Sequence, residues 1–171
     1  MNRTIVTLMA LLYAACGTAA PERAGPASLL LEPGQLNDGR TWTVAATGHG
    51  TWRDLDAGLV PCGKRVIAPM EAATRWRSFT ATDGTTTTQV VVSGVDAMEA
   101  FKFFYAECGA IGSVDSVPGP KNVARHDGEV EVATMSKDRF VVLGGTASHT
   151  QLQLFAETAR THLDAIGRPH H

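Results

Sequence analysis

The sequence predicts an α+β domain: an antiparallel sheet of about four or five strands, built from two hairpin–helix units, with both helices on one face. Three observations lead to this prediction. Two pairs of β-prone segments each contain a turn signal, each pair precedes a segment with helical spacing, and each such segment begins with a capping residue. The chain has 171 residues, enough for one domain, which we expect over residues 29–167 with a short tail over 168–171.

The first hairpin–helix unit covers residues 74–109. The runs TRWRSFTAT and TTTTQVVVS flank Asp83-Gly84, a dipeptide typical of a type I′ turn between two strands. In the next segment, DAMEAFKFFYAECG, Asp96 can cap a helix with Glu99 three residues later, and Gly109 fits the position after its end. The residues expected to face the core are Met98, Phe101, Tyr105 and Cys108.

The second unit follows SVDSVPGPKN (residues 113–122), which we expect to be a loop. Residues 129–134 alternate charged and apolar side chains, residues 136–138 can turn, and RFVVLGG is apolar on both faces, as in a central strand. The closing helix is expected to begin with a Ser148–Gln151 capping box and to end at Gly167. Its expected core stripe is Leu152, Phe155, Ala159, Leu163 and Ile166.

The chain before the first hairpin is rich in proline and glycine. A strand is expected at residues 42–46, and loops with short turns are expected over the rest of the chain up to Pro69.

The amino terminus carries an export signal. Arg3 precedes a nearly continuous apolar run over residues 5–15, which is too short for a bilayer core that needs roughly 20 residues. Residues 1–15 are therefore expected to be a signal peptide. YAACG (residues 13–17) resembles the lipobox of bacterial lipoproteins, which implies acylation of Cys16 at the mature amino terminus and a tether over residues 16–28. The alternative is ordinary cleavage after Ala20, which would give a secreted protein.

Two cysteines remain after Cys16. In an oxidising compartment, Cys62 and Cys108 most simply form a disulfide. Two buried free thiols are the alternative, and a catalytic thiol is disfavoured because no histidine is near either cysteine in the sequence.

Composition and motifs exclude several function classes. Lys and Arg number 15 against 17 Asp and Glu, so the net charge of −2 does not attract the chain to nucleic acid. GxSxG, HExxH and a glycine-rich phosphate loop are all missing from the sequence, and we therefore expect no catalytic residue, no metal and no cofactor.

Weaker candidate sites each have a structural alternative. Arg75 and Arg77 flank Trp76 on a predicted strand and could contact anionic envelope polymers; the alternative is an edge strand with charged residues pointing outward. Glu129 and Glu131, with Asp127 just before them, could hold calcium, although alternating carboxylates usually form a solvated strand face. The remaining aromatic and imidazole candidates, favoured as packing or surface residues, are Trp42, Trp52, His49, His126, His149 and His162.

Several features together resemble a known family. They are the exported leader, the LLLEPGQL opening before a Trp, a cysteine before the first hairpin, a helix AFKFFYAEC that ends in a second cysteine, the RFVVLGG strand and a closing amphipathic helix. The chain resembles actinobacterial secreted and lipoprotein sensor-type domains, which are related to the extracellular domain of PknH-type serine/threonine kinases.

This resemblance implies an α+β domain with a ligand-accepting groove outside the cell. We expect a membrane-tethered lipoprotein at the extracytoplasmic face, with its lipid anchor in the membrane and a non-catalytic domain that binds an envelope ligand or protein partner. A cell-envelope enzyme whose acid and base meet only in the fold is the first alternative, and a structural envelope protein is the second.

Overall fold

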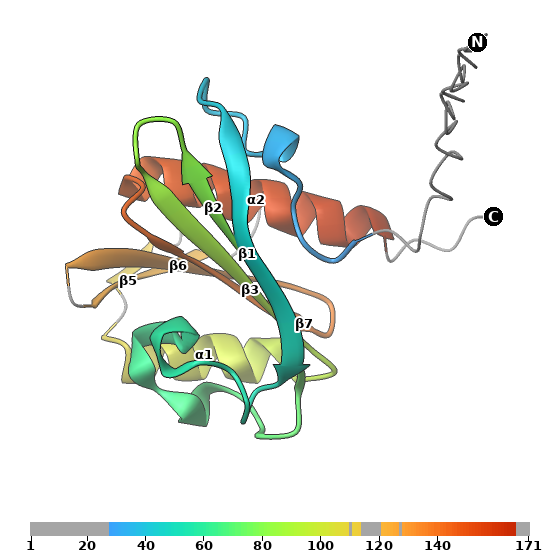
Figure 1. Cartoon of the computed structure of the whole chain (residues 1–171). Helices are drawn as coiled ribbons and strands as arrows, with labels where there is room; N and C mark the ends of the chain where they lie inside the picture. Colours follow the sequence, from blue (N-terminus) through green and yellow to red (C-terminus); the bar gives the residue numbers. More distant parts are fainter. Residues whose placement is uncertain (1–27, 110, 114–120, 127, 167–171) are drawn as a thin grey trace, which may run out of the picture.

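A computed structural model describes residues 28–109, 111–113, 121–126 and 128–166. The expected signal peptide, Cys16, the tether up to residue 27, Asp127, Gly167 and the tail lie outside the described residues. The strands are β1 (Trp42–Thr51), β2 (Ala73–Ala81), β3 (Thr86–Ser93), β4 (Ile111–Ser113), β5 (Lys121–His126), β6 (Glu129–Ser136) and β7 (Arg139–Gly145). The α-helices are α1 (Ala97–Glu107) and α2 (His149–Ile166), and the short 3₁₀ helices are η1 (Pro33–Gln35), η2 (Ala57–Leu59), η3 (Pro61–Gly63) and η4 (Arg65–Ile67) (Figure 1).

The described strands form one antiparallel sheet in the order β1-β2-β3-β7-β6-β5-β4. The α+β class is as predicted, but the sheet has seven strands rather than four or five. The extra strands β4 and β5 lie at the two ends of the expected loop over residues 113–122. Their turn-rich sequence forms strands because β5 pairs with β6 along its length and buries Val123 and Ala124.

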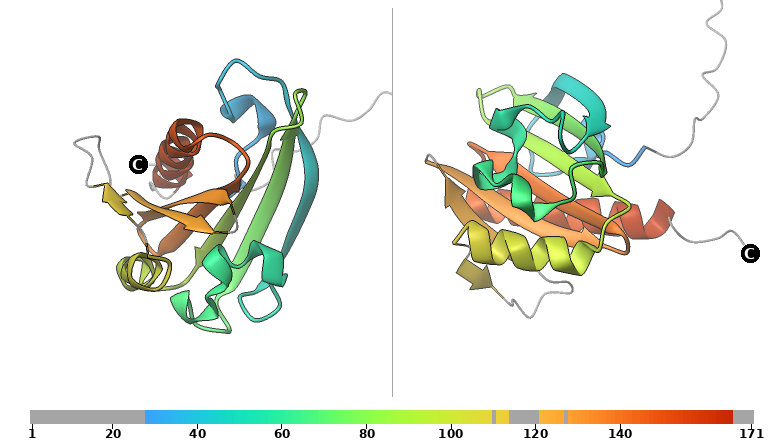
Figure 2. Two further views of the ribbon diagram at one scale, coloured as in Figure 1. Left: turned by 90° about the vertical axis from the view of Figure 1, so that its left-hand side faces the viewer. Right: turned by 90° about the horizontal axis from the view of Figure 1, so that it is seen from below.

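The helices lie on opposite faces of the sheet, so the prediction of a single helical face is wrong. On β3, Val91 packs in the core cluster with α2, whereas its neighbours Val90 and Val92 pack in the cluster with α1. We call these sides the α2 face and the α1 face. The left view of Figure 2 shows α2 above the β5–β6 part of the sheet and α1 below it. Central strands that are apolar on both faces require cover on both sides, which one helical layer cannot provide.

The two helices bury different shares of their predicted stripes. On α2, Leu152, Phe155, Ala159 and Leu163 are fully buried, as predicted, whereas the last predicted residue, Ile166, is half-buried. On α1, the buried residues are Ala97, Ala100, Phe101 and Phe104, whereas Met98 is 44% and Tyr105 is 50% exposed. The sequence AMEAFKFFYAE carries two overlapping apolar stripes at helical spacing, and the sheet covers the one that includes Phe104.

The helix caps follow the sequence closely, whereas the β2–β3 turn has the predicted position but another type. Asp96 accepts a hydrogen bond from the Glu99 backbone N–H at 3.0 Å, and Ser148 and Gln151 form the predicted reciprocal capping box. At the β2–β3 turn only Gly84 has a positive φ, of 83°, so the turn is not the predicted type I′. The three residues between Ala81 and Thr85 instead fit a type I turn followed by a left-handed glycine.

The segment before β1 is part of the α2-face core. Leu30, Leu31 and Leu36 are buried among residues of α2 and the sheet. The fully buried Gln89 of β3 accepts a hydrogen bond from the Leu31 N–H at 2.8 Å, which fixes this segment against the sheet.

Candidate functional site

A disulfide joins η3 to the end of α1. Cys62 and Cys108, the pair that the sequence singles out, are bonded to each other with a Cα–Cα distance of 5.7 Å. Cys62 lies in the irregular stretch between β1 and β2, and Cys108 caps α1. The bond therefore ties this stretch, which has only short 3₁₀ turns of its own, to a regular helix on the α1 face.

Cys62 has an unusual backbone conformation that a carboxylate supports. Its φ is +43°, a region that non-glycine residues rarely occupy, and Gly63 next to it has a φ of +69°. The Cys62 N–H donates to both carboxylate oxygens of Glu131 on β6, at 3.0 and 2.9 Å. The disulfide and Glu131 thus hold the same residue from two sides, and strained backbone of this kind is frequent at binding sites.

A pocket of about 230 Å³ opens beside this contact, between the η2–η3 stretch and the α1 face of the sheet. One wall is the η2–η3 stretch, and the floor comes from β3, β6 and β7. The lining residues are Gly58, Leu59, Pro61, Thr86, Thr88, Val90, Glu129, Glu131, Val142, Gly144 and Gly145.

Glycine at position 144 keeps this pocket open. A Cβ placed on Gly144 would lie 3.2 Å from the Cγ of Glu131, so any side chain there would press on the carboxylate arm and enter the hollow. A glycine inside a strand often marks such a close approach. The glycine pair at the end of RFVVLGG is a signal that could have indicated such an approach, but the sequence alone did not single it out, because the role of Gly144 becomes visible only beside Glu131.

The pocket is polar, and the charged side chains in its described lining are two carboxylates. Glu129 is exposed and Glu131 is half-buried, and both side chains line the pocket together with the hydroxyls of Thr86 and Thr88. Among the described side chains no Lys, Arg or His lines the pocket; the side chain of His126, whose backbone pairs opposite Glu129, lies outside the described residues. Such a lining can accept hydrogen bonds from hydroxyl or ammonium groups and disfavours anionic ligands.

The Glu129 and Glu131 pair is therefore not a plain solvated strand face, because Glu131 is bonded to the Cys62 backbone. Among the described residues, the group of His, Cys, Asp and Glu side chains that is compact enough for a metal is Cys62, Cys108 and Glu131. Its two sulfur atoms are bonded to each other, so they are not available as ligands.

Arg75, Trp76 and Arg77 do not form one site. The β2 strand that carries them pairs with β1 and β3 and is not an edge strand, which corrects the structural alternative given for them. Arg77 is 16% exposed, donates to the Leu31 carbonyl at 2.7 Å and pairs with Glu32, so it holds the N-terminal segment in place. Arg75 remains exposed on the α2 face, while Trp76 lies on the α1 face above Gly48.

The other aromatic and imidazole candidates are mainly structural. Trp42 and Trp52 are 4% and 0% exposed, in line with the packing role favoured from the sequence. The His162 ring lies 2.7 Å from the Ser28 carbonyl oxygen and 3.2 Å from the Gln35 amide, which joins α2 to the N-terminal segment. His49 is exposed on β1, His149 is partly buried, and the side chain of His126 lies outside the described residues.

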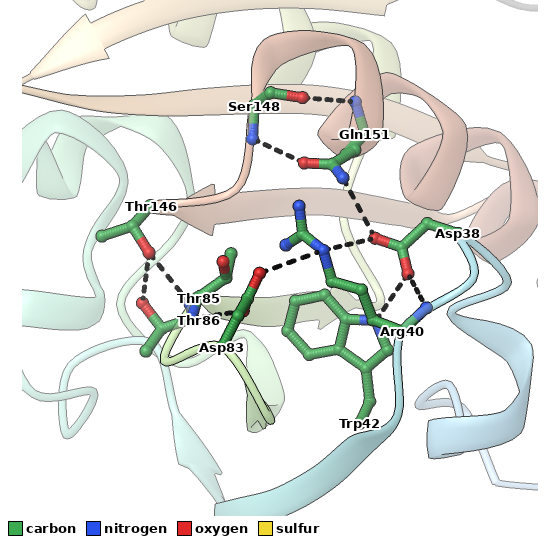
Figure 3. A network of polar contacts seen from close by, with 9 residues as sticks. All are labelled: Asp38, Arg40, Trp42, Asp83, Thr85, Thr86, Thr146, Ser148 and Gln151. Atoms are coloured by element: carbon green, nitrogen blue, oxygen red, sulfur yellow. Dashed lines mark hydrogen bonds and ion pairs between the residues drawn. The ribbon is translucent and has the colours of Figure 1, made fainter.

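A polar network that the sequence did not indicate closes the opposite end of the sheet from α1 (Figure 3). Asp38, with its side chain 4% exposed, accepts hydrogen bonds from the Arg40 N–H, the Trp42 indole N–H and the Gln151 amide at 3.1, 3.0 and 3.2 Å. The Arg40 guanidinium lies between the carboxylates of Asp38 and Asp83 and 5.8 Å from the centre of the Trp42 ring. The network joins the N-terminal segment, the β2–β3 turn and the start of α2.

This network reaches the rim of the pocket. The Thr86 N–H donates to the Thr146 hydroxyl at 2.9 Å, and Thr86 also lines the pocket. At the adjacent turn, hydrogen bonds from the Thr85 backbone N–H and then the Thr85 side chain lower the pKa of Asp83 from its usual value of 3.8. Burial opposes this shift, and the charge of Arg40 adds a smaller lowering effect. The β2–β3 turn is thus anchored next to Thr86, the lining residue at the start of β3.

The comparisons with known proteins leave the function open. No protein family model matches the sequence, and no curated protein matches it. Among solved structures, the chain is similar to the crystal structure of a GTP binding regulator from Thermotoga maritima, with 16% identity, coverage of 72% of this chain and 78% of that chain, and a TM-score of 0.47. In the part of the chain that the structure describes, no helix is both long and apolar enough to cross a membrane.

Proposed function

We propose that this protein is an exported lipoprotein, anchored at the extracytoplasmic face of the membrane through Cys16, whose folded domain binds a ligand without catalysing a reaction. The pocket between the η2–η3 stretch and the α1 face is the proposed ligand site. The observation that carries the proposal is the Glu131–Cys62 contact, because it makes one carboxylate both a lining group of the pocket and a support of its disulfide-bound wall.

The chemistry of the lining favours a ligand rich in hydroxyl or amino groups. The two carboxylates offer acceptors, and among the described lining residues no basic side chain balances their charge. Neutral sugars and amino sugars present donors of this kind, whereas uronic acids bring like charges toward Glu129 and Glu131. This assignment replaces the anionic polymers first considered for Arg75 and Arg77, since Arg77 is occupied by Leu31 and Glu32.

The proposed pocket can be tested with soluble glycans. Saturation-transfer NMR on the purified full chain is expected to detect oligosaccharides of neutral or amino sugars but not oligosaccharides of uronic acids. Glu129→Gln should weaken the signal by removing an exposed charge at the pocket, whereas Glu107→Gln, the same exchange on the exposed side of α1, should leave it unchanged. Equal binding of uronic acids, or equal effects of the two variants, would argue against this site.

The lipid anchor is tested separately. Cys16→Ala is expected to move the protein from the membrane fraction into the medium or to leave the precursor unprocessed, and to abolish labelling with acyl donors. If lipid labelling persists in Cys16→Ala, the anchor is not at this residue; if the wild-type protein is found only in the medium, the alternative cleavage after Ala20 is correct.

A further inference from the structure

The strand β1 is an unusually long free edge of the sheet. It has ten residues, where strands typically have about 5–6, and it pairs with β2 on one side only. Residues 43–47 are all exposed, and so are His49 and Gly50. Within the described part of the chain no other strand pairs with β1 (Figure 2).

The flanking hydrogen bonds determine which backbone groups of β1 point outward. Beyond its C-terminal end, the Trp52 N–H donates to the Ala72 carbonyl of the facing segment at 2.8 Å. Antiparallel residues alternate between bonded and non-bonded pairs, and the register is regular from residue 46 to residue 51. Gly50 and Gly48 therefore bond to β2, whereas Thr47 and His49 direct their N–H and C=O groups away from the sheet.

Apart from the irregularity at residues 44–46, the usual devices that prevent strand addition are missing from this edge. Free edges are commonly protected by lysine, proline or inward-pointing charges. The sequence of β1, WTVAATGHGT, contains no Lys, Arg, Asp, Glu or Pro, and its irregularity is confined to residues 44–46. On the α1 face neither Gly48 nor Gly50 has a side chain. The Trp76 ring covers Gly48, and a Cβ on Gly48 would lie only 2.6 Å from ring atoms of Trp76.

We propose that β1 pairs antiparallel with β1 of a second copy of this chain, so that the two sheets become continuous. In this pairing Thr47 lies opposite His49 of the second copy, so that the outward N–H and C=O groups of the two residues can bond to each other. Gly48 then lies opposite Gly48 of the second copy. That central pair is of the non-hydrogen-bonded type, in which Cα atoms approach to about 4.5 Å, and glycine suits the close approach.

A second copy is the favoured occupant because the strand is self-complementary. None of its residues except His49 can carry a charge, so antiparallel pairing with itself brings no like charges together, and His49 lies opposite a threonine rather than another histidine. Two-fold pairing of one patch with itself is also the commonest symmetry of protein dimers. The proposal is independent of the ligand pocket, which lies over β3, β6 and β7.

The test compares Thr47→Pro with Thr47→Val in the exported full chain. Proline removes an N–H that faces outward and that β2 does not use, whereas valine keeps it; both lose the bond from the Thr47 hydroxyl to the Trp76 carbonyl. In sedimentation velocity from micromolar to millimolar concentration, wild type and Thr47→Val should reach twice the mass of the monomer, and Thr47→Pro should stay monomeric. A monomeric wild type, or a dimer of unchanged affinity in Thr47→Pro, overturns the proposal.

Two further measurements keep the test decisive if the proline variant does not fold. Thr47→Lys, which places an edge charge without altering the backbone, should also reduce the mass by half. Amide hydrogen exchange in the wild type should slow several-fold at Thr47 and His49 as the concentration rises, while Gly48, already bonded to β2, should not change. If the exchange rates of Thr47 and His49 do not change with protein concentration and Thr47→Lys is still a dimer, the association uses another surface and the proposal is wrong.

Discussion

Removal of the disulfide is the perturbation whose effect follows most directly from the structure. The bond spans 46 residues, and in the chain-entropy account closing a loop of that size stabilises the folded state by about 4 kcal/mol. Replacing both cysteines by serine should lower the free energy of unfolding by about that amount. The Glu131 carboxylate remains bonded to the backbone of residue 62, so the η3 turn keeps one of its two supports.

A second variant separates the cross-link from the backbone conformation. Because residue 62 has a φ of +43°, serine there retains the cost of a left-handed conformation, about 1–2 kcal/mol, which glycine does not have. The double variant Cys62→Gly/Cys108→Ser should therefore be more stable than Cys62→Ser/Cys108→Ser by about 1 kcal/mol, even though glycine contributes no side-chain contacts at residue 62.

The assay is urea unfolding followed by tryptophan fluorescence. Trp52 is fully buried in the same core cluster as Cys62 and reports on this part of the structure. An unchanged urea midpoint in the double serine variant, or two free thiols in the exported wild type by non-reducing mass analysis, would refute the role given to the disulfide. Equal stability of the glycine and serine variants would refute the argument from φ.

Two other predictions concern single positions. Gly48→Ala should destabilise the fold by about 1–3 kcal/mol and shift the fluorescence of Trp76, because the new Cβ would lie 2.6 Å from the Trp76 ring. Gly50→Ala on the same strand is the control. Its Cβ would have its nearest contact at 3.9 Å, so the fluorescence of Trp76 should not shift. The lowered pKa of Asp83 means that its stabilising contribution is present above its unfolded value of 3.8 and is lost as the pH falls through the lower folded value. Asp83→Asn should therefore make the acid limb of the stability curve less steep below about pH 4, and an identical limb would show that the bonds to Thr85 do not contribute.

Local patterns identified much of the secondary structure. The Asp96 cap, the Ser148–Gln151 capping box, the β2–β3 and β6–β7 strand pairs and most of the α2 core stripe follow from spacing rules that act within a few residues, and the structure has them. The strand β5 was missed although its partner β6 is the next strand along the chain, with His126 opposite Glu129. β5 has a turn-rich sequence on its N-terminal side, and it becomes a strand only because β6 provides bonds along its length.

The candidate pocket shows the same division. Cys62, Cys108, Glu129 and Glu131 were all noted in the sequence, but as unrelated features. The contact between Glu131 and the Cys62 N–H joins residues 69 positions apart, and no local pattern encodes such a contact. The choice between the two stripes of α1 was likewise made by packing, because Phe104 fits against Phe140 with ring centres 6.1 Å apart, whereas Met98 and Tyr105 face outward.

The sequence by itself determined the α+β class, the positions of the turns and helix caps, the pair of cysteines and the apolar character of the central strands, because these depend on side-chain chemistry and short-range spacing. Only the tertiary structure decided that the helices cover opposite faces, that β1 is a free edge and that Glu131 supports the wall of a pocket. These features depend on which distant segments meet, and that is set by the burial of the whole apolar surface at once rather than by any one segment.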